Sequence, residues 1–113
     1  MKTCFISGAI TGVENYKENF IAAEDQVKEL GYIPVNPARM TESLVANNVE
    51  FTNDQWLEIT SAVLKQCDAI YMLSDWHDSK GAKQEYFFAK LLFNKKILYQ
   101  NPEDETRMKV DSE

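Results

Sequence analysis

The feature that most constrains this chain is a regular alternation of short apolar runs with longer amphipathic segments. Four runs rich in β-forming residues lie at 2–6, 32–35, 68–73 and 95–100, and three segments with helical spacing separate them. Strands that alternate with helices predict a parallel sheet covered by helices, with right-handed crossovers. The chain of 113 residues has room for one such domain, expected at 1–100, followed by a charged tail at 101–113.

The predicted helices span residues 16–30, 52–66 and 80–93. The first repeats apolar residues at steps of three and four, and Gly31 follows it where a C-terminal cap belongs. Asn53 or Asp54 is the expected cap of the second. Residues 41–51 are polar and poorly periodic, which predicts a loop or a loose helical turn.

The strand patterns suggest the order of the sheet. Pro34 in the second run favours an edge position, and the third run is apolar enough to be buried on both faces. We therefore expect an α/β fold: a small flavodoxin-like or Rossmann-like three-layer sandwich with a four- to five-stranded parallel sheet, order 2-1-3-4. The tail after Asn101 is expected to be frayed.

Charge and cysteine content exclude several classes of function. The net charge of -6 argues against a nucleic-acid groove, which needs clustered Lys and Arg. The apolar runs are too short to cross a bilayer and the start does not look like a signal peptide, so we expect a cytoplasmic protein without a membrane partner. Cys4 and Cys67 have no His or Cys neighbours and are expected as reduced core thiols, with no metal and no organic cofactor.

Topology indicates where a ligand site lies. In a sheet of order 2-1-3-4, ligands bind beyond the carboxyl ends of strands 1 and 3. The loops at those ends are 7–12 (SGAITG) and 74–82 (SDWHDSKGA). These loops also hold the residues that look most chemical.

The start of the third helix is a candidate anion site. Its free amides and positive dipole end suit a phosphate, with Ser79 as hydroxyl donor and Gly81 allowing close approach. The alternative is that Asp78 or Ser79 merely caps the helix. Glu85 lies one turn beyond Gly81, where we expect the helix dipole to keep the carboxylate ionised, ready to attack a carbon or orient a sugar hydroxyl. The alternative is a solvated glutamate.

Other candidates are weaker. His77 is a possible catalytic base, although a lone His in a turn is more often solvated or a cap. Phe20 and Trp56 are expected in the core, whereas Trp76 and Tyr16 remain open for stacking on a base. The third helix is apolar almost all round, which suggests a subunit contact as well as a sheet contact.

Four stretches together resemble the nucleoside 2-deoxyribosyltransferase-like superfamily, above all its short bacterial and phage members. They are FISGAITG (5–12), GYIPVNPA (31–38), CDAIYML (67–73) and SKGAKQE (79–85). The resemblance covers residues 1–99 and implies a glutamate nucleophile, matched by Glu85, that attacks C1' of the sugar and releases the base. Homo-oligomers, dimers or larger, are also implied.

The resemblance also implies a substrate class. Ser79 stands where 5'-monophosphate N-glycosidases have Ser and transferases for free nucleosides have Asp, and a hydroxyl suits a phosphate better than a carboxylate does. The expected substrate-binding residues are Ser7, Gly8, Ile10, Thr11, Asn36, Thr60, Ser79, Gly81 and Ala82.

One departure bears on catalysis. Thr60 stands where characterised members carry an assisting Asp, and a threonine is no general acid at neutral pH. Asp75, Asp54 and Glu58 are the candidate substitutes. Glu58 points roughly opposite to Thr60. Asp75 is preferred and is expected as a second catalytic residue, because it follows the third strand and faces the crevice by topology.

Three interpretations follow. The first is an enzyme, an N-glycosidase or deoxyribosyltransferase that cleaves a nucleoside 5'-monophosphate or nucleoside. The second is a non-catalytic nucleotide-binding or nucleotide-sequestering module on the same fold, which Thr60 favours. The third is a small structural or interaction protein.

Overall fold

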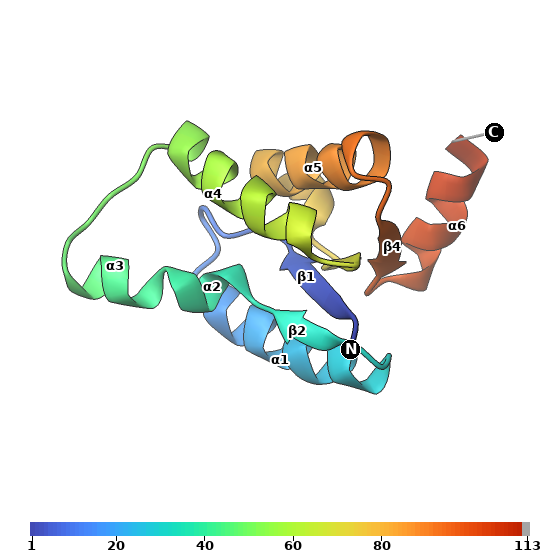
Figure 1. Cartoon of the computed structure of the whole chain (residues 1–113), viewed down its shortest axis with the longest axis horizontal. Coiled ribbons are helices and arrows are strands. Elements are labelled where there is room, and N and C mark those ends of the chain that lie inside the picture. The colour runs from blue at the N-terminus through green and yellow to red at the C-terminus, as the bar shows by residue number, and fades with distance from the viewer. Residues whose placement is uncertain (112–113) are drawn as a thin grey trace.

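The computed structural model describes residues 1–111, without the side chains of residues 43, 45 and 109–111. Its elements follow the predicted alternation (Figure 1), in the order β1 (Thr3–Ser7), α1 (Tyr16–Glu29), β2 (Ile33–Val35), α2 (Pro37–Met40), α3 (Glu42–Ala46), α4 (Asn53–Gln66), β3 (Ala69–Met72), η1 (Trp76–Asp78), α5 (Lys80–Phe87), η2 (Phe88–Leu92), β4 (Lys96–Tyr99) and α6 (Pro102–Asp111).

The sheet confirms the predicted topology. Its four strands are parallel in the order β2-β1-β3-β4, so β1 and β3 lie at the centre and the topological switch point falls between them. Pro34 pairs with Cys4 on the edge strand β2, where its missing amide costs no ladder hydrogen bond. All residues of β3 are buried, because helices cover both faces of this strand.

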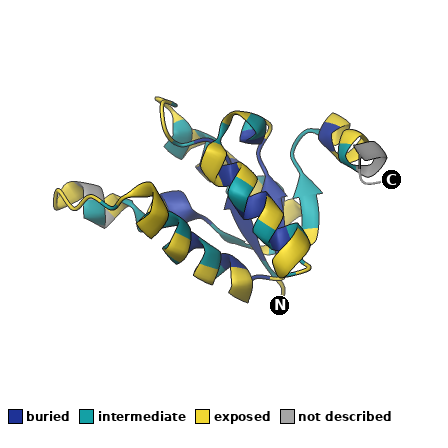
Figure 2. Ribbon diagram, turned by 90° about the horizontal axis from the view of Figure 1, so that it is seen from above, coloured by how far each residue is buried: buried dark blue, intermediate teal, exposed yellow. Residues whose placement is uncertain are grey.

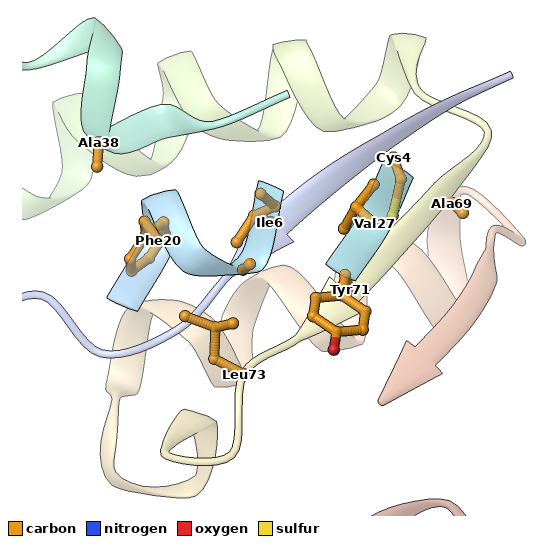
Figure 3. Packing of buried hydrophobic residues seen from close by; sticks show 9 residues of the cluster. Cys4, Ile6, Phe20, Val27, Ala38, Ala69, Tyr71 and Leu73 are labelled. Atoms are coloured by element: carbon orange, nitrogen blue, oxygen red, sulfur yellow. The ribbon is translucent and has the colours of Figure 1, made fainter. Parts of the chain in front are cut away.

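Helices cover the two faces of the sheet unequally. Helix α1 lies against one face, and α4 and α5 lie against the other (Figure 1). The core beside α1 includes Phe20, Val27 and alternate residues of β1 and β3 (Figure 3). Because side chains alternate along a strand, Cys4 and Ile6 face α1, whereas Phe5 and Ser7 face α4 and α5. Cys4 and Cys67 are both buried free thiols.

The C-terminus of α1 and the N-terminus of α4 can be compared with the capping residues that the sequence predicts. Gly31 has φ +92°, and the Tyr32 amide donates to the Val27 carbonyl, so α1 ends as its sequence predicts. Helix α4 starts where predicted but with a different cap. Thr52 accepts from the Gln55 amide and the Gln55 side chain accepts from the Thr52 amide, so neither Asn53 nor Asp54 is the cap.

Two further regions depart from the sequence predictions. After β2, Pro37–Met40 form the short helix α2, which Asn36 caps, so this stretch does more than end the strand. The helix predicted at 80–93 is α5 followed by the π-helical turn η2. Trp56 is only half-buried and packs edge-on against Phe51, so its predicted place in the core is wrong, whereas Phe20 is fully buried as predicted.

The frayed tail predicted after Asn101 is also wrong, because residues 102–111 form α6 beside β4 (Figure 2). Pro102 occupies the first helical position, and the Asn101 Oδ1 accepts from the Glu103 amide at 3.0 Å. Acidic residues fill the first turn, where the helix dipole favours them.

Candidate functional site

The centre of the candidate site is a hydrogen bond between β1 and α5. Ser7 Oγ donates to Glu85 Oε1 at 2.7 Å, and both side chains are buried. Ser7 is the last residue of β1 and points to the α5 face of the sheet. Glu85 shares its helix face with Ala82, Tyr86 and Ala89, which are core residues. The glutamate is therefore not the solvated side chain of the alternative interpretation.

Burial controls the charge of this carboxyl group. Removal from water raises the pKa of Glu85 from 4.5 to about 7, although the hydroxyls of Ser7 and Thr60 oppose the rise by stabilising the ionised form. The prediction that the helix dipole keeps Glu85 ionised is wrong. Glu85 is the sixth residue of α5, beyond the first turn to which the dipole effect is confined.

Thr60 approaches Glu85 from α4. Its side chain is buried, and its Oγ1 donates to the Leu57 carbonyl at 3.4 Å. Glu58 is exposed, as is Asp54 near the start of the helix. The prediction that Glu58 points away from Thr60 is consistent with this difference in burial. Thr60 is thus a hydroxyl neighbour of the buried carboxyl rather than a second acid.

The first loop is packed closely against the end of β3. A Cβ on Gly8 would lie 2.6 to 2.9 Å from three side-chain atoms of Leu73, so only glycine fits there. Ile10 is half-buried against the α1 core, and Thr11 is exposed. Of the described loop residues expected to bind substrate, Ser7 alone is hydrogen-bonded to Glu85.

Asp75 serves a different part of the crevice. Its Oδ1 accepts from the Ala9 amide at 3.1 Å, which joins the two site loops. The rest of the side chain borders a half-open cleft of about 290 Å³, lined by Asn19, Ala22, Leu73, Ser74, Asp75 and Gln100. This cleft lies beside α1, and the hydrogen bonds found for Asp75 and Glu85 go to different groups, the Ala9 amide and Ser7 Oγ. A catalytic role for Asp75 stays a prediction.

Ser79 caps helix α5. Its Oγ accepts from the Ala82 amide at 3.1 Å and its carbonyl accepts from Lys83, which leaves the amides of Lys80 and Gly81 as free donors at this helix end. A Cβ on Gly81 would meet only Ser79 Oγ, at 3.9 Å, so the helix end is open to an approaching group. Ala82 is a core residue.

Asn36 is engaged elsewhere. Its Oδ1 accepts from the Ala38 amide at 2.9 Å and its Nδ2 donates to Glu24 at 3.1 Å. Glu24 also pairs with Arg39 at 2.7 Å, and these contacts lower the pKa of Glu24 below its usual value. Asn36 thus has a structural task at the start of α2, and its expected role in substrate binding stays a prediction.

The structure also locates the aromatic residues and the histidine to which the sequence assigns no definite role. Trp76 is buried against Tyr86, so its ring is not free to stack on a base, whereas Tyr16 is only half-buried against the α1 core. His77 Nε2 lies 2.9 Å from Asp104 Oδ1, on the α6 side of the turn and not beside Glu85. Sequence reasoning misses Asp104, because the charged residues after Asn101 predict a frayed tail.

Fold and site together define an α/β protein with a doubly wound parallel sheet and a buried glutamate beside the switch point. The chain belongs to the family described as a domain of unknown function (DUF4406), whose model matches residues 2–99. Comparisons with curated proteins and with solved structures gave no match. The family description names no activity, and the residues of the site are therefore the basis for a functional proposal.

Among the helices of residues 1–111, none has the length and apolar character needed to span a membrane. Within the same residues, no three His, Cys, Asp or Glu side chains gather closely enough to hold a metal ion.

Proposed function

We propose that the protein cleaves the N-glycosidic bond of a nucleoside 5'-monophosphate or nucleoside, with Glu85 as nucleophile. The observation that carries the proposal is the buried Glu85 carboxyl group, hydrogen-bonded to Ser7 at the carboxyl end of β1. A carboxyl group held at a switch point, within a dry environment, is suited to attack an electrophilic sugar carbon. The resemblance to nucleoside 2-deoxyribosyltransferase-like proteins supports the same role.

The proposed reaction has two steps. The ionised Glu85 attacks C1' of the sugar, the C1'–N bond breaks with its electron pair going to the base, and the base takes a proton from solvent or a neighbouring acid. Water then cleaves the glycosyl ester, which returns the carboxylate and gives a free sugar phosphate. A second base in place of water gives transfer instead of hydrolysis.

The N-terminus of α5 supports a phosphate as part of the substrate. The free amides of Lys80 and Gly81 and the positive helix end favour an anion. Ser79, in contrast to an aspartate at this position, adds no negative charge. The substrate class we propose is therefore a nucleoside 5'-monophosphate before a free nucleoside.

Glu85 must be ionised to act as nucleophile, and this gives the proposal a pH signature. Because burial raises the pKa of Glu85 to about 7, turnover is expected to rise with pH through that value.

Thr60 favours a second candidate function, a non-catalytic module that binds or sequesters nucleotides. Among the described residues, the groups that interact with the Glu85 carboxyl group are the hydroxyls of Ser7 and Thr60, and neither is a carboxylate. Without an assisting acid, the leaving base would have to take its proton from solvent. The same crevice would then bind a nucleotide without releasing its base.

We further propose that the protein is a cytoplasmic homo-oligomer. Three apolar side chains are exposed where α5 and η2 end. Phe87 is the last residue of α5 and is 54% exposed, and Leu91 and Leu92 end η2 and are 70% and 69% exposed. Apolar side chains gathered on a helix in this way are typical of a protein contact. The two buried free thiols are consistent with a reducing compartment.

The test is incubation of the purified protein with ribo- and deoxyribonucleosides and their 5'-monophosphates, followed by chromatography for free base. Release from a monophosphate that is absent in Glu85→Gln supports the proposal, whereas equal release in this variant would exclude Glu85 as nucleophile. Binding by both proteins without release would favour the second candidate. Ser79→Asp should weaken binding of the monophosphate more than that of the nucleoside.

A further inference from the structure

The contact between η1 and α6 is not explained by the proposed function. His77, in the turn that leads into α5, lies with Nε2 2.9 Å from Oδ1 of Asp104 in the first turn of α6. The histidine side chain is 37% exposed, whereas that of Asp104 is only 4% exposed. A surface histidine is thus tied to a buried carboxyl group from the far end of the chain.

Helix α6 lies outside the region that the family model matches, which ends at residue 99. It nevertheless packs on the molecule, with Met108 against the core that contains Trp76 and Tyr86. Burial, the neighbouring Tyr86 and the acidic Asp104 and Glu105 all raise the pKa of Tyr99, in that order. The acidic start of α6 is therefore close to β4 and to the turn.

The turn between β3 and α5 is fastened at several points. The Ser74 amide donates to Gln100 Oε1 at 2.8 Å, and Asp75 holds the Ala9 amide. Trp76 is buried beneath the turn and Ser79 caps α5. The His77 contact is the point at which α6 joins this set.

Burial of the Asp104 carboxyl group has an unfavourable free energy of its own. Asp104 Oδ2 has no hydrogen-bond partner, and neither has the indole Nε1 of Trp76, among the buried side-chain atoms of the described residues. An incompletely satisfied buried carboxyl group adds little or nothing to the global stability of the fold, although its hydrogen bond still favours one local arrangement of the turn. Such a contact is better suited to fixing a position than to stabilising the fold.

We propose that Asp104 is a positioning residue for the candidate site. Acting through His77, it holds the turn from Ser74 to Ser79 and so fixes the first turn of α5, where the free amides and Ser79 face the proposed phosphate. Only the consequence for ligand binding depends on the proposed function. The positioning itself is measurable on the protein without ligand.

The first experiment is amide hydrogen exchange by NMR on wild type, Asp104→Ala and Asp104→Asn. The reporters in the turn are the amides of Ser79 and Ala82, bonded to the Trp76 carbonyl and to Ser79 Oγ, and the core reporter is Leu73, bonded to the Ser7 carbonyl. Loss of a buried hydrogen bond should speed exchange in the turn about tenfold relative to the core in Asp104→Ala. Asp104→Asn keeps an oxygen for His77 and should restore slow exchange.

His77→Ala provides a second route to the same test, because it removes the contact from its exposed side and leaves α6 intact. It should give the same selective acceleration as Asp104→Ala. Equal acceleration of turn and core amides in both variants, or none in either, would overturn the proposal. If Asp104→Ala does not fold, His77→Ala decides the question alone.

The ligand readout uses the same variants in a Glu85→Gln background, with calorimetric titration of a nucleoside and its 5'-monophosphate. His77→Ala should weaken binding of the monophosphate several-fold and leave that of the nucleoside unchanged. Equal losses for both would contradict action through the start of α5. If no nucleotide binds to any of the proteins, the proposed function fails, while the exchange result still decides the role of Asp104.

Discussion

Replacement of Glu85 by glutamine makes the most direct test of the site. Burial of the Glu85 carboxyl group makes the stability of the wild type depend on pH, and glutamine removes that dependence because it does not titrate. Burial raises the pKa of Glu85 from 4.5 to about 7. The folded protein therefore binds a proton more tightly than the unfolded chain between these pH values. This contribution to stability is fully present below pH 4.5 and is lost as the pH rises through about 7.

The magnitude follows from the same values. Each pH unit by which a pKa is raised corresponds to about 1.4 kcal/mol, so ionising Glu85 costs the folded state about 3 kcal/mol at pH 8 and above. Glutamine has the shape of the protonated acid and keeps an oxygen to accept from Ser7. Glu85→Gln should therefore match wild type near pH 4.5 and be more stable by about 3 kcal/mol at pH 8.

Urea denaturation of both proteins from pH 4.5 to 8.5 measures the difference, and the titration of all other groups cancels between them. Glu58→Gln removes the same charge from an exposed position of α4 and is the matched control, with a difference that should stay within about 0.5 kcal/mol. A difference between wild type and Glu85→Gln that is constant across the range would show that the carboxyl group does not change its protonation on folding, and the reasoning would be wrong.

Four other substitutions test the surroundings. Ser7→Ala removes a hydrogen bond that favours the ionised form, so the pKa of Glu85 should rise further, as followed by NMR titration of its carboxyl carbon. Gly8→Ala should destabilise the fold by about 1–3 kcal/mol in urea denaturation, because its new methyl group would overlap a leucine side chain, and wild-type stability would refute this packing. Gly81→Ala meets open space within a helix and should stabilise the protein by up to about 1 kcal/mol while weakening monophosphate binding; unchanged binding would argue against contact with the helix end. Leu91→Glu should reduce self-association in light scattering, and a monomeric wild type would contradict the proposed oligomer.

The sequence could predict the sheet because its signals are local and consistent. The four apolar runs became β1 to β4, and the order followed from Pro34 on an edge strand and from a third run buried on both faces. Gly31 ended α1 because only a residue that tolerates a positive φ suits that position. The TNDQ stretch also contained the capping box of α4, a signal that was present but assigned to the wrong residues.

The environment of Glu85 could not be read from neighbouring residues. Its burial arises from Ser7 and Thr60, which lie 78 and 25 positions away in the chain, and only the packed helices remove the carboxyl group from water. The tail shows the same limit, since Asp104 is buried by a turn that precedes it by 27 positions. The sequence predicted an ionised Glu85 and a frayed, charged tail, because neither the carboxyl group's loss of water nor the packing of the tail can be seen in local charge.

By itself, the sequence determined the order of strands and helices, the parallel sheet, and the two loops that meet at its switch point, because the periodicity of apolar residues and the rules of chain connection act on short stretches. The tertiary structure alone decided which carboxyl groups are dry and what each contacts. It raised the pKa of Glu85, directed Asp75 to the Ala9 amide and joined Asp104 to His77. These properties depend on desolvation and on contacts between distant segments, and such effects exist only once the chain has packed.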